Sequence, residues 1–465
     1  MKLATFPTVL AAVALAIATP AVAQTAPPAS ASAPGSGAAS PKIDVKYTQF
    51  KLPNGLTVIL HEDHAVPLVS TNMWYHVGSA REKPGRTGFA HLFEHLMFMG
   101  SGHVKPGEFD DWLEGTGGTN NGSTENDRTN YWINVPSNAI ELALFLESDR
   151  MGYLLESMTP KTVDAQRDVV KNERRQSYEN RPYGQAQLLL GELLYPEGHP
   201  YHWPVIGYMP DLTAASYDDV VDFFKKYYSP GNASLVVAGD IDPVATRKLV
   251  EKWFGDIKPG AAVEKVTPPP VALNGVTKRT ITDKVQLPRV YVAWLTPPHF
   301  APGDAALDMV ADALAGGKNS RLYKRLVYDL QIAQDVSAYQ ASQALSSYFV
   351  IQATARPGHT TEELLKVIDE EVAKLQSETP PARETQRSIN TIEASFLKRL
   401  EQVGGFGGKA DQLNAYYTAT GNADYFNQDL ARYRSMRPSN VRDAAARYLP
   451  KDRRVELTVL PEGAK

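Results

Sequence analysis

The sequence predicts a protein of two similar halves, each of which mixes β-strands with α-helices. Short runs rich in β-branched and aromatic residues are typical of strands, and longer segments with apolar residues at helical spacing are typical of helices. Residues 259–274, which contain three consecutive prolines, are typical of a linker between domains. Elements expected before this stretch partly recur after it, which indicates a two-fold repeat.

Composition and charge exclude several classes of protein. Of the 465 residues, 43% are hydrophobic and 22% are charged, as in ordinary globular proteins. The formal net charge is -4 and no basic run occurs, so nucleic acid is not expected as a partner. Because the sequence has no cysteine, disulfides and thiolate metal sites are excluded.

The first residues have the features of an export signal. Lys2 is followed by an apolar run at 9–19 and by Ala21-Val22-Ala23, which suits cleavage, so residues 1–23 are predicted to be a signal peptide. The apolar run is too short to span a bilayer. Residues 24–44 are rich in Ala, Pro, Ser and Gly and predict a disordered linker. We expect an exported protein, periplasmic if the cell is Gram-negative, with no membrane span.

The predicted N-terminal domain, residues 45–258, begins with strands. Pro53-Asn54-Gly55 lies between two apolar runs and predicts a β-hairpin. A further strand is expected at 68–77. Residues 115–130, rich in Gly, Asn and Thr, precede another strand at 131–135.

Helices follow these strands. Thr87 can cap a strongly apolar helix that Gly100 can end, so polar side chains on this helix are expected to be buried or to line a cleft. A second helix is expected up to Met151. Thr159-Pro160 begins a third, which extends to about Tyr178.

The predicted C-terminal domain, residues 275–465, partly repeats this order. Residues 290–295 predict a strand like that at 68–77, and residues 307–314 predict a helix in the place of the one that follows Thr87. That second helix contains no histidine, so only the first half is expected to carry a metal site.

The helix after Thr87 contains His91-Leu92-Phe93-Glu94-His95. Two histidines four residues apart lie on one face of a helix, at the spacing that a tetrahedral metal needs. Glu94 reaches the same face, where a carboxylate can accept a proton from water. The order of residues reverses the commoner zinc-protease motif. So short a motif also occurs by chance, so its meaning depends on a third ligand.

Glu173 is the candidate for that third ligand. It shares a helical stripe with Gln166, Val169, Val170 and Ser177. A carboxylate on the apolar side of a helix is unusual unless it is paired. The alternative is an ordinary surface salt bridge with the arginines and lysines around it.

These residues resemble the inverted-motif zinc metallopeptidases of the pitrilysin/insulinase (M16) family. The similarity extends from about Val45 to the end of the chain, and it is strongest to the compact two-domain bacterial branch related to mitochondrial processing peptidase subunits. The resemblance implies an α+β fold of two similar halves, each a mainly antiparallel sheet with helices on one face, which enclose a chamber. Further signatures that agree are Gly88-Phe89-Ala90, Asn121-Gly122-Ser123-Thr124 and Arg128-Thr129-Asn130-Tyr131.

The resemblance also implies a metal and a reaction. His91, His95 and Glu173 would hold one Zn²⁺ per chain, and Glu94 would be the catalytic base. The chain would then be an endopeptidase that hydrolyses peptides or small unfolded proteins.

Substrate contacts follow from the same resemblance. A peptide would add as a strand beside residues 119–124, where Asn121 and Gly122 would bind it chiefly through their backbones. Gln166 stands where family members often carry Glu, and it could orient neighbouring groups by hydrogen bonds without adding charge.

Two further positions depart from the family pattern. Active single-chain relatives carry an Arg and, seven residues later, a Tyr that contact substrate from the second half; the aligned residues here are Val327 and Gln334. In some bacterial relatives zinc and this pair lie on different subunits. The chain is therefore predicted to be the zinc-bearing subunit of a heterodimer whose paralogous M16 partner supplies Arg and Tyr. The alternatives are a catalytically inert binding or structural subunit, and a maturase that cuts one dedicated precursor.

Three other groups are given structural interpretations. His199 and His202 resemble a metal pair but lie in an expected loop, so packing or surface roles are favoured. Residues 404–408, Gly-Gly-Phe-Gly-Gly, lack the Lys and Ser/Thr of a phosphate-binding loop and predict a flexible loop that faces the chamber. Glu82 is also expected to have a structural role.

Overall fold

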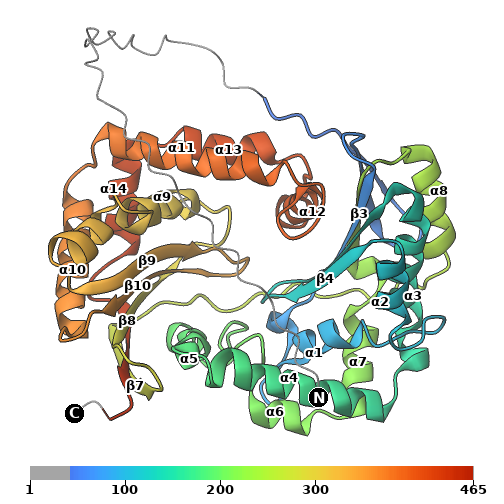
Figure 1. The fold of residues 1–465 in the computed structure, drawn as a ribbon, viewed down its shortest axis with the longest axis horizontal. Coiled ribbons are helices and arrows are strands. Elements are labelled where there is room, and N and C mark those ends of the chain that lie inside the picture. Colours follow the sequence, from blue (N-terminus) through green and yellow to red (C-terminus); the bar gives the residue numbers. More distant parts are fainter. Residues whose placement is uncertain (1–41, 464–465) are drawn as a thin grey trace, which may run out of the picture. The chain divides into compact units, whose positions relative to one another are not determined.

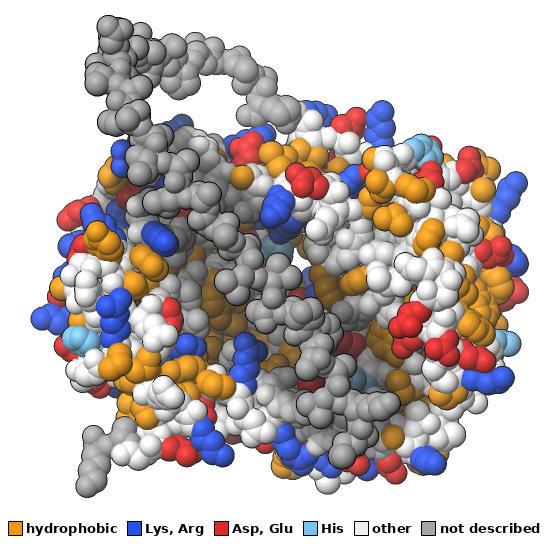
Figure 2. Space-filling view, viewed as in Figure 1, with side chains coloured by type: hydrophobic (Ala, Val, Ile, Leu, Met, Phe, Trp, Pro, Cys, Tyr) orange, Lys and Arg blue, Asp and Glu red, His pale blue; other side chains and the backbone are white. Residues whose placement is uncertain are grey.

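The computed structural model describes residues 42–463. The predicted signal peptide, residues 1–23, lies outside this range, as does all but the last three residues of the predicted linker at 24–44. From Ile43 onward the described chain forms one compact unit. Within it, no helix combines the length and the apolar character needed to cross a bilayer. Figure 2 shows acidic and basic side chains interspersed over the visible described surface.

The first sheet, which contains the β3 and β4 labelled in Figure 1, has six strands in the order β1-β2-β6-β3-β5-β4. Neighbouring strands are antiparallel except for β2 and β6, which are parallel. The pairing of Lys51 with Thr57 confirms the predicted hairpin. The strands are β1 (Thr48–Lys51), β2 (Thr57–Glu62), β3 (Leu68–Tyr75), β4 (Thr119–Thr124), β5 (Thr129–Pro136) and β6 (Ala233–Gly239).

The second sheet has five strands in the order β7-β11-β8-β10-β9. Here β7 and β11 are parallel and the other neighbours antiparallel, so these strands take the places of β2, β6, β3, β5 and β4. The predicted repeat is therefore confirmed strand by strand, with β1 added to the first copy. The strands are β7 (Val276–Asp283), β8 (Arg289–Thr296), β9 (Ala333–Ala341), β10 (Ser347–Ala355) and β11 (Arg454–Pro461).

Helices connect the strands in both halves. Those that precede β7 are α1 (Phe89–Leu96), α2 (Glu108–Gly115), α3 (Ile140–Ser157), α4 (Pro160–Arg174), α5 (Gly184–Leu194), α6 (Met209–Ala214), α7 (Tyr217–Tyr227) and α8 (Pro243–Phe254). Those that follow β8 are α9 (Asp304–Ala315), α10 (Thr361–Ser377), α11 (Ala382–Arg399), α12 (Lys409–Thr420), α13 (Phe426–Arg434) and α14 (Pro438–Tyr448). Short 3₁₀ or π-helical turns are Ser79–Arg81, Ser137–Ala139, Arg175–Glu179, Pro230–Asn232 and Tyr323–Asp329.

Each sheet also receives a helix from the other half of the chain. The α12 helix packs against β6 and β3 of the first sheet, and α5 packs against β11 and β8 of the second. Met73 of β3 is buried in the core under α1, whereas its neighbours Asn72 and Trp74 bond to Asp411 of α12. Since successive side chains of a strand face opposite sides, α1 and α12 cover opposite faces of this sheet. The prediction of helices on one face of each sheet is therefore incomplete, because the exchanged helix α12 covers the other face of the first sheet.

The helix that carries the histidines is shorter than the sequence predicts. It begins after Gly88, whose φ of 87° is left-handed, and it ends at Leu96 rather than at Gly100. Thr87 does not cap it, because its hydroxyl donates to Asp211. The buried Glu82 carboxylate instead accepts hydrogen bonds from the backbone N–H groups of Gly88 (2.9 Å) and Ala90 (2.8 Å). This contact forms only because the loop after Glu82 returns the chain to the Glu82 side chain, and the local sequence does not specify that path.

The next two predicted helices, α3 and α4, also differ from expectation in their ends. A 3₁₀ turn at Ser137–Ala139 precedes α3, which continues beyond Met151 to Ser157. Thr159 caps α4 as predicted, with its side chain accepting from the N–H of Thr162. Regular α-helix then ends at Arg174, and the chain continues as a π-helical turn.

Candidate metal centre

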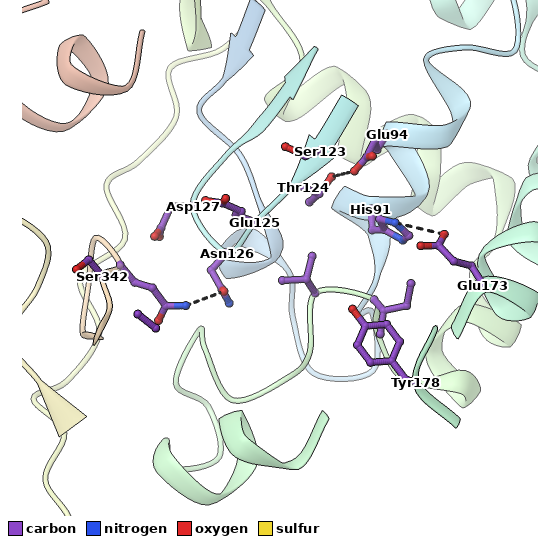
Figure 3. Close-up of a pocket in the computed structure, with 14 residues that line it drawn as sticks. His91, Glu94, Ser123, Thr124, Glu125, Asn126, Asp127, Glu173, Tyr178 and Ser342 are labelled. Carbon is purple, nitrogen blue, oxygen red and sulfur yellow. Dashed lines mark hydrogen bonds and ion pairs between the residues drawn. The ribbon is translucent and has the colours of Figure 1, made fainter. Parts of the chain in front are cut away.

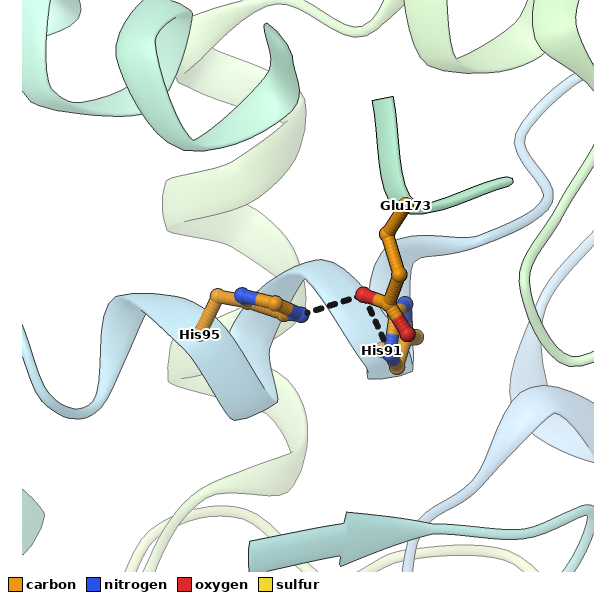
Figure 4. Close-up of side chains that lie close together, drawn as sticks. All are labelled: His91, His95 and Glu173. Carbon is orange, nitrogen blue, oxygen red and sulfur yellow. Dashed lines mark hydrogen bonds and ion pairs between the residues drawn. The ribbon is translucent and has the colours of Figure 1, made fainter. Parts of the chain in front are cut away.

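The α1 helix presents two imidazoles to one side while its apolar residues anchor the other. Leu92, Phe93 and Leu96 are buried in the core of the first half. The side chains of His91 and His95 are 11% and 24% exposed. Their spacing of four residues places both on the face directed toward α4, as Figure 4 shows.

Glu173, near the end of α4, completes a group of three potential ligands. Its Oε2 lies 3.1 Å from Nε2 of His95 and 3.6 Å from Nε2 of His91 (Figure 4). Tetrahedral zinc with bonds of about 2.0–2.2 Å separates neighbouring ligand atoms by roughly 3.3 Å. The donor set and its spacing therefore fit zinc. Among residues 42–463, these three side chains form the only group of three or more His, Asp or Glu residues whose ligand atoms lie close enough together to bind one metal ion.

The surroundings of Glu173 disfavour the alternative of a surface salt bridge. Its side chain is 38% exposed, and its ion-pair partners in the described chain are the two histidines. Of the stripe expected on α4, Val170 is fully buried but Val169 is 45% exposed, so the stripe is only partly buried. Nearby basic residues contact other groups: Arg167 pairs with Asp164, Lys171 with Asp168, Arg174 with Glu179, and Arg175 with Asn172.

The protonation states of these groups suit metal binding. Burial lowers the pKa of His91 to about 4, so its imidazole is neutral near pH 7, which is the form that binds metals. The hydrogen bond from His95 lowers the pKa of Glu173, which keeps this carboxylate ionised. The neutral imidazole of His91, the imidazole of His95 and the ionised carboxylate of Glu173 then face a common point.

Glu94 lies beside these groups but in a different environment. Burial raises the pKa of its carboxyl, and the hydroxyl of Thr124 donates to its Oε2 at 2.6 Å. Gly122 permits this approach of β4 to α1, because a Cβ atom at Gly122 would lie 3.2 Å from Cγ of Glu94. The backbone N–H of Gly122 donates to the side-chain oxygen of Asn121.

A cavity of about 490 Å³ joins this cluster to the second half of the chain. Figure 3 shows His91 and Glu173 on one side and Ser342 on the other. Residues 341–343, which end β9 and begin the turn to β10, form part of the lining, and the side chain of Gln343 donates to that of Asn126 at 3.0 Å. Both halves thus build the space beside the three ligands.

The structure brings His91, His95, Glu173, Glu94 and Gly122 together. Among the described residues, other predicted groups lie apart from them. The amide of Gln166 contacts the sulfur of Met99 and makes no hydrogen bond to a ligand. Val327 packs partly buried on the core of the second half, Gln334 is exposed on β9, and neither lines the cavity. His199 stacks on Tyr195 with ring centroids 4.6 Å apart, which agrees with a packing role.

Sequence reasoning did not assign two contributions to this site. Thr124, which donates to Glu94, belongs to the Asn121–Thr124 signature, and its place in that motif could have indicated a role in the site. Residues 341–343 carry no local signal, because they reach the cavity only through the contact between the two halves.

Comparison with known sequences extends over most of the chain. The family model described as Insulinase (Peptidase family M16) matches residues 57–194, and that described as Peptidase M16 inactive domain matches residues 214–392. The chain is 29% identical over 391 residues to the zinc protease PqqE of Helicobacter pylori, covering 83% of this chain and 87% of that protein. It is 23% identical to the probable mitochondrial-processing peptidase subunit beta of Arabidopsis thaliana, covering 86% and 75%.

Solved structures give the same relationship. The crystal structure of a protease from Helicobacter pylori matches this chain with a TM-score of 0.82 and 27% identity. The match covers 90% of this chain and all of that one. The two-half α+β architecture is therefore shared with a known protease.

Proposed function

Because the chain belongs to peptidase family M16, we propose that it is a zinc-dependent endopeptidase that hydrolyses peptides or small unfolded proteins. The observation that carries the proposal is the convergence of His91, His95 and Glu173 within 4.8 Å of one another, beside the half-buried carboxyl of Glu94. A relative named zinc protease supports the metal and the reaction class.

Each side chain of the cluster has a chemical role in this proposal. Zn²⁺ held by His91, His95 and Glu173 would supply a Lewis acid that activates water and polarises the peptide carbonyl. Glu94 accepts the proton of the attacking water and returns it to the leaving amine. Its raised pKa brings it closer to the pH at which a group serves both steps. The Thr124 hydroxyl holds the Glu94 carboxylate in place.

The edge of the first sheet would orient the substrate. β4 pairs only with β5 among the described strands, so its outer edge is available to an extended peptide. Thr124 at its end bonds to Glu94, which places this edge beside the proposed base. Asn121 and Gly122 would contact the peptide backbone. The N–H of Gly122, which donates to the side-chain oxygen of Asn121, would then donate to a carbonyl of the peptide instead.

We further propose that the chain works with a paralogous subunit. Val327 and Gln334 replace the expected Arg and Tyr, and a relative named as a processing-peptidase subunit supports a paired assembly. The proposed domains are 45–258, with zinc, and 275–465, without metal ligands, joined by 259–274. Export remains part of the proposal, on the grounds of residues 1–23.

The proposal is tested with zinc-loaded wild-type chain and the Glu94→Gln variant, each with and without the partner. Glu94→Gln should retain zinc and lose peptide cleavage by about 10²- to 10⁴-fold, because a positioned base contributes that much. Glu179→Gln, which removes a carboxylate just beyond α4, serves as the matched control. Full cleavage by zinc-loaded Glu94→Gln would contradict the mechanism. Cleavage by wild type at a rate unchanged by the partner would contradict the heterodimer.

An inert binding subunit is the second candidate function. It is favoured by the replacement of Arg and Tyr at Val327 and Gln334. The same experiment separates the two functions, since an inert subunit cleaves no peptide alone and Glu94→Gln leaves any cleavage by its complex unchanged.

A further inference from the structure

The face of the first sheet that lies opposite α1 carries polar and aromatic side chains next to the free edge. In the β4–β5 ladder, Asn121 pairs with Trp132 and Ser123 pairs with Asn130. Tyr131 and Ile133, which face the other way, are buried in the core. Trp132 therefore points toward the face covered by α12 and lies one strand away from the free edge.

The loop at 404–408 is fixed on this face by the chain that follows it. The N–H of Gly407 donates to Asp411 at 2.9 Å, and the side chain of Gln412 donates to the Gly407 carbonyl at 2.7 Å. Gly404 is in close contact with the sheet, because a Cβ atom there would lie 2.1 Å from Oδ1 of Asn134. These contacts hold the loop against the sheet, and the flexibility that the sequence predicts for it stays a prediction.

Phe406, at the tip of this loop, forms an aromatic pair with Trp132. The ring centroids are 5.6 Å apart and the rings are nearly perpendicular, at 89°. Phe406 remains 46% exposed, and Asn121, the residue opposite Trp132 on the edge strand, is also exposed. An aromatic surface contributed by both halves of the chain is thus open beside the strand that would receive substrate.

We propose that Trp132 and Phe406 form a subsite that selects a bulky apolar side chain of the peptide substrate. This inference rests on the proposed peptidase function. A peptide added to β4 directs alternate side chains to the face of Trp132 and Phe406, where an apolar side chain covers the exposed ring. A polar or charged side chain would lose hydration there without gaining a partner.

The position of this subsite follows from the strand. Thr124 marks the level of Glu94, and Asn121 lies three residues earlier on β4. Because a strand rises about 3.3 Å per residue, the aromatic pair lies roughly 10 Å along the strand from the proposed base. The selected side chain is therefore about three residues from the cleaved bond.

The test compares peptides that differ at one position, Leu or Phe against Asn, scanned along the peptide. The zinc-loaded chain, with its partner where cleavage requires it, should show kcat/KM roughly 10-fold higher for the apolar residue at about three residues from the cleaved bond. Phe406→Ala should reduce this ratio to about two-fold or less, while Phe406→Leu keeps most of it. Leu397→Ala, a similarly exposed apolar residue on α11, should leave the ratio unchanged.

Two results would overturn the inference while leaving the proposed function intact. One is a wild-type ratio near one at every position; the other is a Phe406→Ala variant that cleaves all peptides more slowly by the same factor. Dissociation constants of labelled peptides for Glu94→Gln give a readout without cleavage. If no peptide is cleaved, the proposed function fails, and the subsite then stands or falls on whether Phe406→Ala removes the apolar preference in binding to Glu94→Gln.

Discussion

At the scale of single residues, Glu94 and Glu173 carry the same side chain in opposite electrostatic surroundings. Burial raises the pKa of Glu94, whereas the hydrogen bond from His95 lowers the pKa of Glu173. An ionised carboxylate beside two imidazoles suits a metal ligand, and a buried carboxyl with a raised pKa suits proton transfer. The two environments therefore agree with the two roles that we propose for these residues.

Removing the charge of Glu173 should weaken zinc binding. We expect Glu173→Gln to bind zinc at least about 10-fold more weakly than wild type, because an amide is a poorer ligand than a carboxylate. Competition with a chromogenic chelator measures this affinity. Glu179→Gln, whose carboxylate pairs with Arg174, should bind zinc as wild type does. Equal affinities of all three proteins would exclude Glu173 as a ligand.

Asp308 on α9 makes the stability of the second half depend on pH. Burial raises the pKa of its carboxyl from the usual value of 3.8 to about 7, although the Tyr433 hydroxyl donates to it at 2.7 Å. Below about pH 4 both folded and unfolded chains hold this proton, so there is no cost. As pH rises to about 7, the unfolded chain ionises first, and the folded state loses stability.

Asp308→Asn should remove this cost while keeping an oxygen for Tyr433. We expect the variant to be more stable than wild type by about 2–4 kcal/mol at pH 8, with a smaller difference at pH 5. Urea unfolding of the two proteins at both pH values measures the difference. A stability difference that is the same at pH 5 and pH 8 would contradict the assignment.

At the scale of elements, one carboxylate fixes α12 to the first sheet. Oδ1 of Asp411 accepts from Asn130 and Trp74 (both 3.0 Å) and from Asn72 (3.2 Å), and Oδ2 accepts from the N–H of Gly407. These donors come from β3, β5 and the glycine-rich loop. Asp411 thereby couples the exchanged helix, the sheet and the position of Phe406.

Asp411→Ala should leave these donors without partners. We expect a loss of about 3 kcal/mol in the free energy of unfolding, because each buried unpaired donor costs about 1–3 kcal/mol. Urea unfolding measures the loss. Asp443→Ala, an exposed residue on α14, should change stability by less than about 0.5 kcal/mol. A similarly small change for Asp411→Ala would show that α12 is held by its apolar contacts alone.

At the scale of the whole molecule, the two halves meet beside the three candidate metal ligands. Asp127, in the turn after β4, accepts from the hydroxyl of Tyr201 and from the N–H of Ala344. The Tyr201 oxygen in turn accepts from the N–H of Leu345. The turn between β9 and β10 is thus bonded to the first half next to the 490 Å³ cavity.

Asp127→Ala should loosen this contact without removing a proposed metal ligand. We expect faster hydrogen exchange at Ala344 and Leu345 and a lower kcat/KM for peptides, with zinc affinity unchanged. Hydrogen exchange followed by mass spectrometry measures the first effect. Glu125→Ala, in the same turn and paired only with Arg128 among the described ion pairs, should leave exchange at Ala344 unchanged. Unaltered exchange in Asp127→Ala would contradict a stabilising role.

Local patterns predicted much of the fold. The Pro53-Asn54-Gly55 turn, the Thr159 cap and the repeat of strands across 259–274 all depend on residues close in sequence. The ends of α1 were less predictable, because the Glu82 carboxylate that caps it acts through tertiary contact. The Met99 contact of Gln166 also depends on how α4 lies beside the chain after α1.

The sequence by itself determined the candidate metal ligands, because helical spacing places His91 and His95 together and Glu173 stands out on its helix. Tertiary structure alone decided the exchange of α5 and α12 between the sheets and the approach of residues 341–343 to the cavity. It also placed Phe406 against Trp132. These contacts join residues hundreds of positions apart, where no local periodicity or turn chemistry specifies a partner, so only the packing of the two halves selects them.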